Sequence, residues 1–284
     1  MHLKLEAFQT AGSFKLRAAQ LKIANLSQAA GEKGIVVGSS GNHGVACAHV
    51  AGQLGVSCKV VVHKAANPYK LGMIAAHGAE VVILPTASDI IPTCRQIVAD
   101  EGRSFIHPFE GWDTVLGTAT LGYEMIHQIG AVDAIAVPVG GGGLISGIAL
   151  AASLMRPGCE VYAVEPRGSD VFRQSLAAGH PVTDTTIASI ADSLNAPFTA
   201  DYSFSVAHPR VSDAVTVSDD EIRSAMGMMV EEFHLALEPA AATAFAGVIG
   251  PLRTQLAGKN VAVIVCGSNI DRATFTAILK GTSA

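Results

Sequence analysis

The stretch that decides the fold reads AIAVPVGGGGLISGIALAASLM and runs from residue 134 to residue 155. It contains no charged residue, and its length would suffice for a membrane-spanning helix. However, Pro138 and the glycines at 140–143 stand within it, and such residues break a helix. A buried strand over 134–139, a glycine turn and a helix over 144–155 therefore explain the stretch better than a membrane span.

The rest of the chain repeats this order of short apolar runs and segments of helical period. The apolar runs do not alternate with polar residues, which is typical of strands buried on both faces of a parallel sheet. The further strands that we expect lie at residues 3–8, 34–38, 58–63, 81–84, 104–106, 160–164 and 260–265. The pattern predicts an α/β protein built on parallel sheets.

Composition narrows the classes of partner. Of 284 residues, 49% are apolar and 15% are charged, and the formal net charge is −5, which does not favour nucleic acid as a partner. The five cysteines are odd in number and lack zinc-type spacing, which indicates reduced thiols. Met1 is followed at once by an alternating segment rather than by a signal peptide. We expect a cytoplasmic protein that binds neither nucleic acid nor a membrane.

A lysine stands where a strand is expected to end. Gly12-Ser13-Phe14-Lys15 follows the first expected strand and precedes a helix expected over 16–26. At this place in an α/β sheet a side chain faces a ligand cleft. A desolvated lysine there can form a Schiff base with an aldehyde. A surface lysine beside a turn is the alternative that this segment alone leaves open.

A polar loop, Ser39-Ser40-Gly41-Asn42-His43-Gly44, lies between an expected strand and an expected helix. Its hydroxyls and amide, with the free N–H groups of a helix start, can hold a carboxylate. Serine and asparagine also favour the N-cap of a helix, so simple capping is the alternative. A cap needs one such residue, whereas this loop has several.

Four consecutive glycines occupy positions 140–143, before Leu144 and the expected helix. They have neither the spacing of a dinucleotide site nor the lysine of a P-loop. Backbone N–H groups that converge at a helix start can hold a single phosphate. The alternative is a tight turn, although a turn needs only one or two glycines.

Taken in order along the chain, these motifs resemble the pyridoxal-phosphate enzymes of the tryptophan-synthase-β fold type. Within that group they resemble the threonine/serine dehydratase and serine racemase branch. Residues 5–15 are similar to that family's cofactor-lysine motif, 39–44 to its asparagine loop, and 140–144 to its phosphate-binding loop. His43 favours the dehydratase side, because the sister branch that makes cysteine typically has threonine there.

The resemblance implies a fold and a domain organisation. The expected fold is two parallel-sheet α/β domains, PLP fold type II, with pyridoxal 5'-phosphate in the cleft between them. The large cofactor domain would comprise residues 1–33 and 111–284. The small substrate domain, inserted into it, would comprise residues 34–110.

The resemblance also implies a role for each site residue. Lys15 would hold the cofactor and move the α-proton, and Ser40 would be an acid or base on the opposite face. The residues that would bind the cofactor are Phe14, Lys15, Asn42, Gly140, Gly141, Gly142, Gly143, Leu144 and Cys266. The residues that would bind the substrate are Ser39, Ser40, Gly41, Asn42 and His43. Cys266 stands where many members have a serine facing the pyridine nitrogen.

The racemase-type cation site of the family is weak in this sequence. Glu165 is present, but Ser169 and Val171 follow where a carbonyl donor and an acidic side chain would be needed. We therefore expect no metal.

The expected activity is that of a lyase, a threonine/serine ammonia-lyase (dehydratase) of amino-acid catabolism. It would eliminate water and ammonia from L-threonine and/or L-serine to give a 2-keto acid, and the enzyme would be a homodimer. Three alternatives stay open. They are a serine racemase, a β-replacement synthase, and an N-terminally shortened member with little activity, since the chain begins close to the lysine motif.

Overall fold

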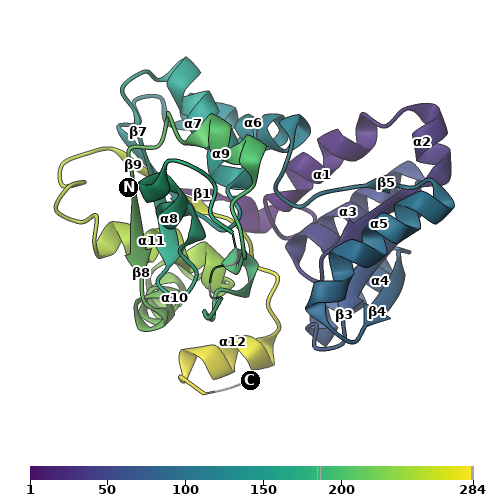
Figure 1. Ribbon diagram of the computed structural model, residues 1–284. Coiled ribbons are helices and arrows are strands. Elements are labelled where there is room, and N and C mark those ends of the chain that lie inside the picture. Colours follow the sequence, from purple (N-terminus) through teal and green to yellow (C-terminus); the bar gives the residue numbers. More distant parts are fainter. Residues whose placement is uncertain (184, 186, 283–284) are drawn as a thin grey trace. The chain divides into compact units, whose positions relative to one another are not determined.

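A computed structural model describes residues 1–183, 185 and 187–282 of the chain. The contacts within the chain divide it into two compact units, whose elements are labelled in Figure 1. The large unit comprises Met1–Phe8 and Phe109–Ala284, and the small unit comprises Gln9–Pro108. Each unit contains its own sheet, which confirms the expected pair of α/β domains.

The small unit has a parallel sheet with the strand order β4-β3-β2-β5. Its strands are β2 (Ile35–Gly38), β3 (Cys58–His63), β4 (Glu80–Leu84) and β5 (Ser104–Phe105). Its helices are α1 (Lys15–Ala24), α2 (Gln28–Lys33), α3 (Asn42–Leu54), α4 (Pro68–Ala76) and α5 (Ile90–Glu101), with a 3-10 turn η2 (Ala87–Asp89). Apolar side chains of α1, α3 and α4 pack on one face of the sheet, and those of α5 pack on the other. Burial on both faces explains the unbroken apolar runs of these strands.

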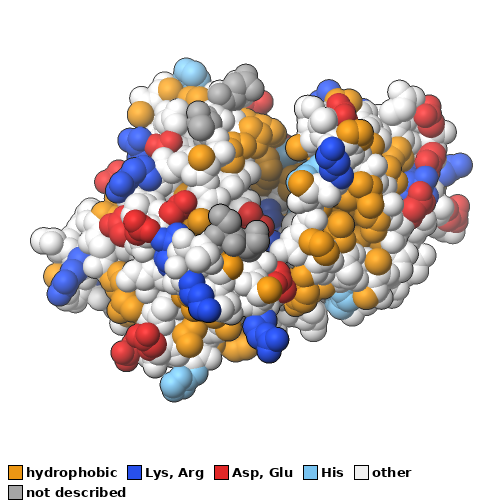
Figure 2. Space-filling view, turned by 90° about the horizontal axis from the view of Figure 1, so that it is seen from below, with side chains coloured by type: hydrophobic (Ala, Val, Ile, Leu, Met, Phe, Trp, Pro, Cys, Tyr) orange, Lys and Arg blue, Asp and Glu red, His pale blue; other side chains and the backbone are white. Residues whose placement is uncertain are grey.

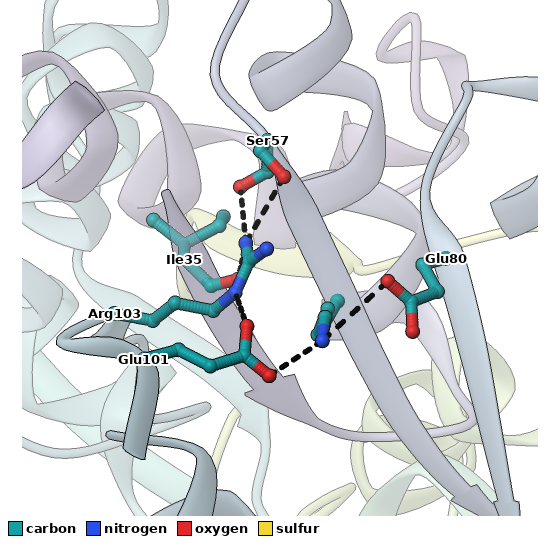
Figure 3. A network of polar contacts seen from close by, with 6 residues as sticks. Ile35, Ser57, Glu80, Glu101 and Arg103 are labelled. Carbon is teal, nitrogen blue, oxygen red and sulfur yellow. Dashed lines mark hydrogen bonds and ion pairs between the residues drawn. The ribbon is translucent and has the colours of Figure 1, made fainter. Parts of the chain in front are cut away.

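A polar network joins the strands of the small unit at the edge where they begin (Figure 3). The Arg103 guanidinium donates to the carbonyl of Ile35 at 3.3 Å, and to the carbonyl and hydroxyl of Ser57 at 3.2 and 3.0 Å. Glu101 accepts hydrogen bonds from Arg103 at 2.7 Å and from Lys59 at 2.6 Å. These two hydrogen bonds lower the pKa of Glu101. The network therefore ties together three segments that are distant in sequence.

The boundary of the small unit differs from our expectation of residues 34–110. Residues 9–33, which we expected in the large domain, belong to the small unit. The reason is the apolar face of α1, since Leu16, Ala19 and Ile23 are buried in the cluster that also contains side chains of α3. Lys15 consequently lies in the same unit as the polar loop 39–44.

The large unit has a parallel sheet with the strand order β1-β9-β6-β7-β8. Its strands are β1 (His2–Leu5), β6 (Ala134–Pro138), β7 (Glu160–Pro166), β8 (Asp213–Val217) and β9 (Val261–Val265). Its helices are α6 (Trp112–Ile129), α7 (Gly143–Met155), α8 (Val171–Ala178), α9 (Asp201–Ala207), α10 (Asp219–Phe233), α11 (Pro239–Ile249) and α12 (Arg272–Leu279), with 3-10 turns η1 (Glu6–Phe8) and η3 (Asp192–Leu194). Helices α6, α7 and α9 form one group and α10 and α11 another (Figure 1).

The stretch 134–155 has the structure that its sequence predicts. Strand β6 is buried along its whole length, and α7 begins at Gly143 after the glycine turn. None of the helices in the described part of the chain is long and apolar enough to cross a membrane. The apolar character of the stretch therefore reflects its place in the core of the large unit.

On one face of the protein the charged side chains are mixed in sign. On the face seen in Figure 2, lysine and arginine side chains stand among aspartate and glutamate side chains rather than in a field of their own. This distribution agrees with the modest net charge of −5.

Candidate active site

The candidate lysine is the first residue of α1. Gly12 adopts a left-handed φ of 69° in the turn before it, a conformation that favours glycine. The Lys15 ammonium donates to the carbonyl of Pro108 at 2.7 Å and lies 5.1 Å from the centre of the Phe14 ring. The Ser13 hydroxyl is fully buried and, within the described residues, has no hydrogen-bond partner. An unpaired buried hydroxyl costs about 1–3 kcal/mol, and such costs are tolerated mainly at functional sites.

The polar loop 39–44 runs from the end of β2 into the first turn of α3, and its geometry disfavours simple capping. The N-cap of α3 is Gly41, and no side chain accepts a hydrogen bond at that cap. The Ser39 hydroxyl accepts from the N–H of Gly41 at 3.2 Å and so shapes the loop itself. Within the described residues, the Ser40 hydroxyl is bonded to no protein group. The loop thus presents a hydroxyl and an uncapped helix start, which together can bind a carboxylate.

The side chain of His43 does not take part in the polar surface of this loop. It is 3% exposed, and its Nε2 lies 2.9 Å from the carbonyl of Ile106. Burial lowers its pKa well below the usual value, and the charge of Lys15 lowers it further. We expected His43 to help hold the substrate carboxylate, but its ring is engaged elsewhere, so only its main-chain N–H is free to do so.

The glycines at 140–143 are required by close packing as well as by backbone conformation. A Cβ on Gly141 would lie 2.4 Å from the ring of Phe109, and one on Gly143 would lie 2.8 Å from the Cα of the same residue. A Cβ on Gly140 would lie 3.0 Å from the carbonyl oxygen of Leu194. Gly142 has a φ of +92° and is the N-cap of α7, where no side chain caps the helix. The run therefore leaves the N–H groups at the start of α7 available to an anion.

Cys266 directly follows β9 and is 3% exposed. Strands β6 and β9 are parallel neighbours with Ala136 opposite Val263. Cys266 therefore lies at the same edge of the large sheet as the glycine loop, which follows β6. The nearby Ser268 hydroxyl donates to the carbonyl of Ala7 at 2.9 Å, which ties this segment to the end of η1.

The candidate residues of each unit thus gather at the carboxyl edge of its sheet. Loop 39–44 follows β2, and residues 106–108 follow the neighbouring parallel strand β5. In open α/β sheets this edge is where ligands bind. The polar network of Arg103 lies at the other edge of the small sheet (Figure 3), and has no part in the site.

Glu165 is buried and caps a helix. Its two carboxylate oxygens accept the N–H groups of Phe172 at 2.9 Å and Arg173 at 2.7 Å, at the start of α8. Burial raises its pKa to about 8, and the two hydrogen bonds oppose that rise. The described residues contain no group of three or more histidine, cysteine, aspartate or glutamate side chains that could hold a metal ion.

Comparison with known proteins decides the family. The model of the family described as "Pyridoxal-phosphate dependent enzyme" matches residues 1–267. The chain belongs to this family. A phenylserine dehydratase from Ralstonia pickettii is 45% identical over 275 residues, which are 97% of this chain and 84% of the relative.

Solved structures of the same family share the fold. The processed threonine deaminase isoform 2 of Solanum lycopersicum superposes with a TM-score of 0.93 at 28% identity, over 98% of this chain and 82% of the other. Maize serine racemase superposes with a TM-score of 0.91 at 33% identity, over 98% of this chain and 86% of the other. These matches confirm the fold class and pyridoxal phosphate as the cofactor.

The residues present fit both the aldehyde and the phosphate of that cofactor. An aldehyde needs an amine, and Lys15 is half-buried at the carboxyl edge of the small sheet, where its Nζ donates to the carbonyl of Pro108. A phosphate needs N–H donors, and α7 begins with glycines and without a side-chain cap. The pattern of side chains and glycines pointed to both of these features. The contacts of Phe109 and Leu194 with these glycines were not predicted from the sequence, because the two residues lie far from the glycines along the chain.

Proposed function

We propose that the protein eliminates water and ammonia from a β-hydroxy amino acid, L-threonine and/or L-serine, to give a 2-keto acid. One observation carries this proposal. Lys15 lies in the same compact unit as a loop that offers the free Ser40 hydroxyl and an uncapped helix start. An amine that can remove a proton and an anchor for the substrate carboxylate are therefore held by one rigid framework.

The cofactor, when bound, withdraws electrons from the substrate's α-carbon and so acidifies its proton. Lys15 would hold the cofactor aldehyde and then take that proton. Its hydrogen bond to Pro108 fixes the direction of the amine. The N–H groups at Gly140–Leu144 would hold the phosphate, Asn42 the ring hydroxyl, and Cys266 the pyridine nitrogen, with Phe14 packed beside them. Ser39, Ser40, Gly41 and the main chain of His43 would bind the carboxylate.

The proposed substrate range includes a larger side chain. A relative at 45% identity is a phenylserine dehydratase, and phenylserine is a β-hydroxy amino acid with an aromatic β-substituent. We therefore include phenylserine beside threonine and serine as a candidate substrate.

Serine racemisation is the second candidate activity. The observation that favours it is the Ser40 hydroxyl, which has no protein partner within the described residues. A racemase needs a second acid or base on the face opposite the lysine. Maize serine racemase also shares the fold at 33% identity.

Two further features of the proposal concern the assembly and the compartment. Helix α6 exposes Trp112, Leu116 and Tyr123, whose spacing places them on one side of the helix. We infer that this stripe contributes to a homodimer interface, which sedimentation of W112E would test by showing a monomer.

The five cysteines are free thiols, which agrees with a reducing compartment such as the cytoplasm.

Keto-acid assays on threonine, serine, hydroxyaspartate and phenylserine test the proposed function, with Lys15→Ala beside the parental protein. We expect 2-keto acid from the parental protein on at least one of these substrates. Lys15→Ala should lose cofactor absorbance and at least about 1,000-fold in rate, because proton transfer and covalent binding are lost together. Keto acid formed equally well by the alanine variant would overturn the proposal. D-serine as the main product would select the racemase.

A further inference from the structure

Three consecutive carbonyls of the small unit each accept a hydrogen bond from a different side chain. Lys15 donates to Pro108 at 2.7 Å, and Lys22 donates to the carbonyl of His107 at 2.8 Å. His43 Nε2 lies 2.9 Å from the carbonyl of Ile106. We call residues 106–108 the strap. All six groups belong to the small unit.

The fold explains how these donors reach the strap. Lys15 and Lys22 are seven residues apart, which is about two turns, so their side chains leave the same side of α1. Helix α3 carries His43 and packs against α1 in one apolar cluster. The strap follows β5, which ends at Phe105. Its carbonyls lie beyond the sheet, and side chains take the place of the missing strand partners.

The positive charge of the side chains around the strap lies on Lys15 and Lys22. Burial lowers the pKa of His107 to about 4, with Lys22 and Lys15 adding to the effect. His43 is likewise held neutral by burial and by Lys15. A carbonyl only accepts hydrogen bonds, so neutral His43 must carry its proton on Nε2. The Cys47 sulfur lies 3.8 Å from Nδ1 and 3.6 Å from Nε2, and of these two nitrogens only the unprotonated Nδ1 can accept from the thiol.

We propose that Lys22 and His43 are positioning residues that hold the strap. The Pro108 carbonyl is thereby placed to accept a hydrogen bond from Lys15 whenever the Lys15 amine is not bonded to the cofactor. This inference rests on the proposed function, in which Lys15 binds and releases the cofactor. One N–H donated to a fixed carbonyl restricts rotation of the amine, and the direction of its lone pair is thereby set. A loose strap would leave the amine with many orientations and slow each step that it performs.

The test measures capture of pyridoxal phosphate by cofactor-free protein. Rapid mixing gives the rate of the visible absorbance change, and borohydride reduction with peptide mapping identifies the lysine. We expect Lys22→Met to slow capture about tenfold, the effect of losing one charge-assisted hydrogen bond. Turnover should show kcat lowered by about the same factor and KM within about twofold, because the carboxylate loop is unchanged.

Three further variants separate positioning from general damage. Lys22→Arg should restore most of the rate, because a guanidinium can also donate to a carbonyl. Lys64→Met, an exposed lysine of the same unit, should behave as the parental protein. His43→Asn should slow capture as Lys22→Met does, because the shorter amide cannot reach Ile106; it keeps the inference testable if Lys22→Met does not fold.

The outcomes for this inference and for the proposed function are distinct. Parental protein that traps no cofactor at Lys15 would overturn both. Trapping at Lys15 with a parental capture rate in Lys22→Met would overturn the inference about the strap alone. Slow capture that Lys22→Arg fails to restore would overturn it as well.

Discussion

The two junctions between a strand and an anion-binding helix are built in opposite ways. Between β2 and α3 the loop carries hydroxyls and an amide, and Ser39 shapes it by bonding the N–H of Gly41. Between β6 and α7 the chain has Val139 followed by glycines, with Phe109 and Leu194 pressed against the glycines. Neither helix has a side-chain cap. By contrast, helix α10, which has no part in the site, begins with a complete capping box of Ser218 and Glu221.

The difference reflects what each junction would bind. A phosphate that stays in place is held by fixed main-chain donors, which glycine brings into close reach. A substrate carboxylate arrives and leaves at every turnover beside the reacting atoms, so its loop gains from side chains that also orient or move protons. The four predictions below test this comparison, beginning with the largest expected effect.

Gly141→Asp should weaken cofactor binding by roughly 100-fold or more, because a like charge near a bound phosphate costs several kcal/mol. The new Cβ would also collide with the Phe109 ring. Equilibrium titration with pyridoxal phosphate measures the loss. Gly141→Ala separates the two causes, since it brings the collision without the charge.

Gly227→Asp is the matched control for Gly141→Asp. It adds the same charge to the large unit at a glycine with open space around its Cα, and its affinity should equal that of the parental protein. If Gly141→Asp also bound the cofactor normally, the glycine junction would not be the phosphate site and the comparison would fail.

Ser40→Ala should reduce racemisation by roughly 100-fold and elimination by less than about tenfold. Only racemisation needs a proton delivered from the second face, and acid–base residues contribute about 100- to 10,000-fold. Chiral chromatography of serine and a keto-acid assay on the same sample give both rates. Ser39→Ala is the control, because losing its bond to Gly41 should raise KM for both reactions alike. Equal losses in Ser40→Ala would count against the division of roles.

Acid should destabilise the small unit, which contains the junction built from side chains. The pKa values of His43 and His107 are lowered in the folded protein, so the unfolded chain binds more protons below the usual histidine value. The free energy of unfolding should therefore fall as the pH falls from about 6.5 to about 4, by up to about 1.4 kcal/mol per pH unit for each histidine. Urea unfolding across this range, compared with His107→Gln, measures the slope. A slope unchanged in that variant would contradict the assignment.

Cys266→Ser should have the smallest effect, within about twofold on keto-acid formation. A hydroxyl replaces a thiol of similar size at the edge of the large sheet, and the glycine junction is untouched. Steady-state kinetics and the visible spectrum of the loaded protein check this prediction. Loss of most activity would show that the sulfur itself takes part in the chemistry.

Local patterns in the chain determined much of this protein. The apolar runs predicted the parallel strands except β8, which we did not expect. The breakers within 134–155 predicted a strand, a turn and a helix in place of a membrane span. The spacing from Gly12 to Lys15 predicted the start of α1. These features depend on backbone conformation and on burial of neighbouring residues, and both can be read from a short window of sequence.

Tertiary structure alone decided the rest, because it depends on residues far apart along the chain. Burial of α1 against α3 moved Lys15 into the small unit. The His43 ring contacts the carbonyl of Ile106 and so does not line the polar loop that contains His43 in the sequence. The contact of Phe109 with Gly141 and Gly143 showed why those positions exclude any side chain. The sequence shows which hydrogen-bond donors and acceptors are present, whereas only the packed chain determines which acceptor each donor reaches.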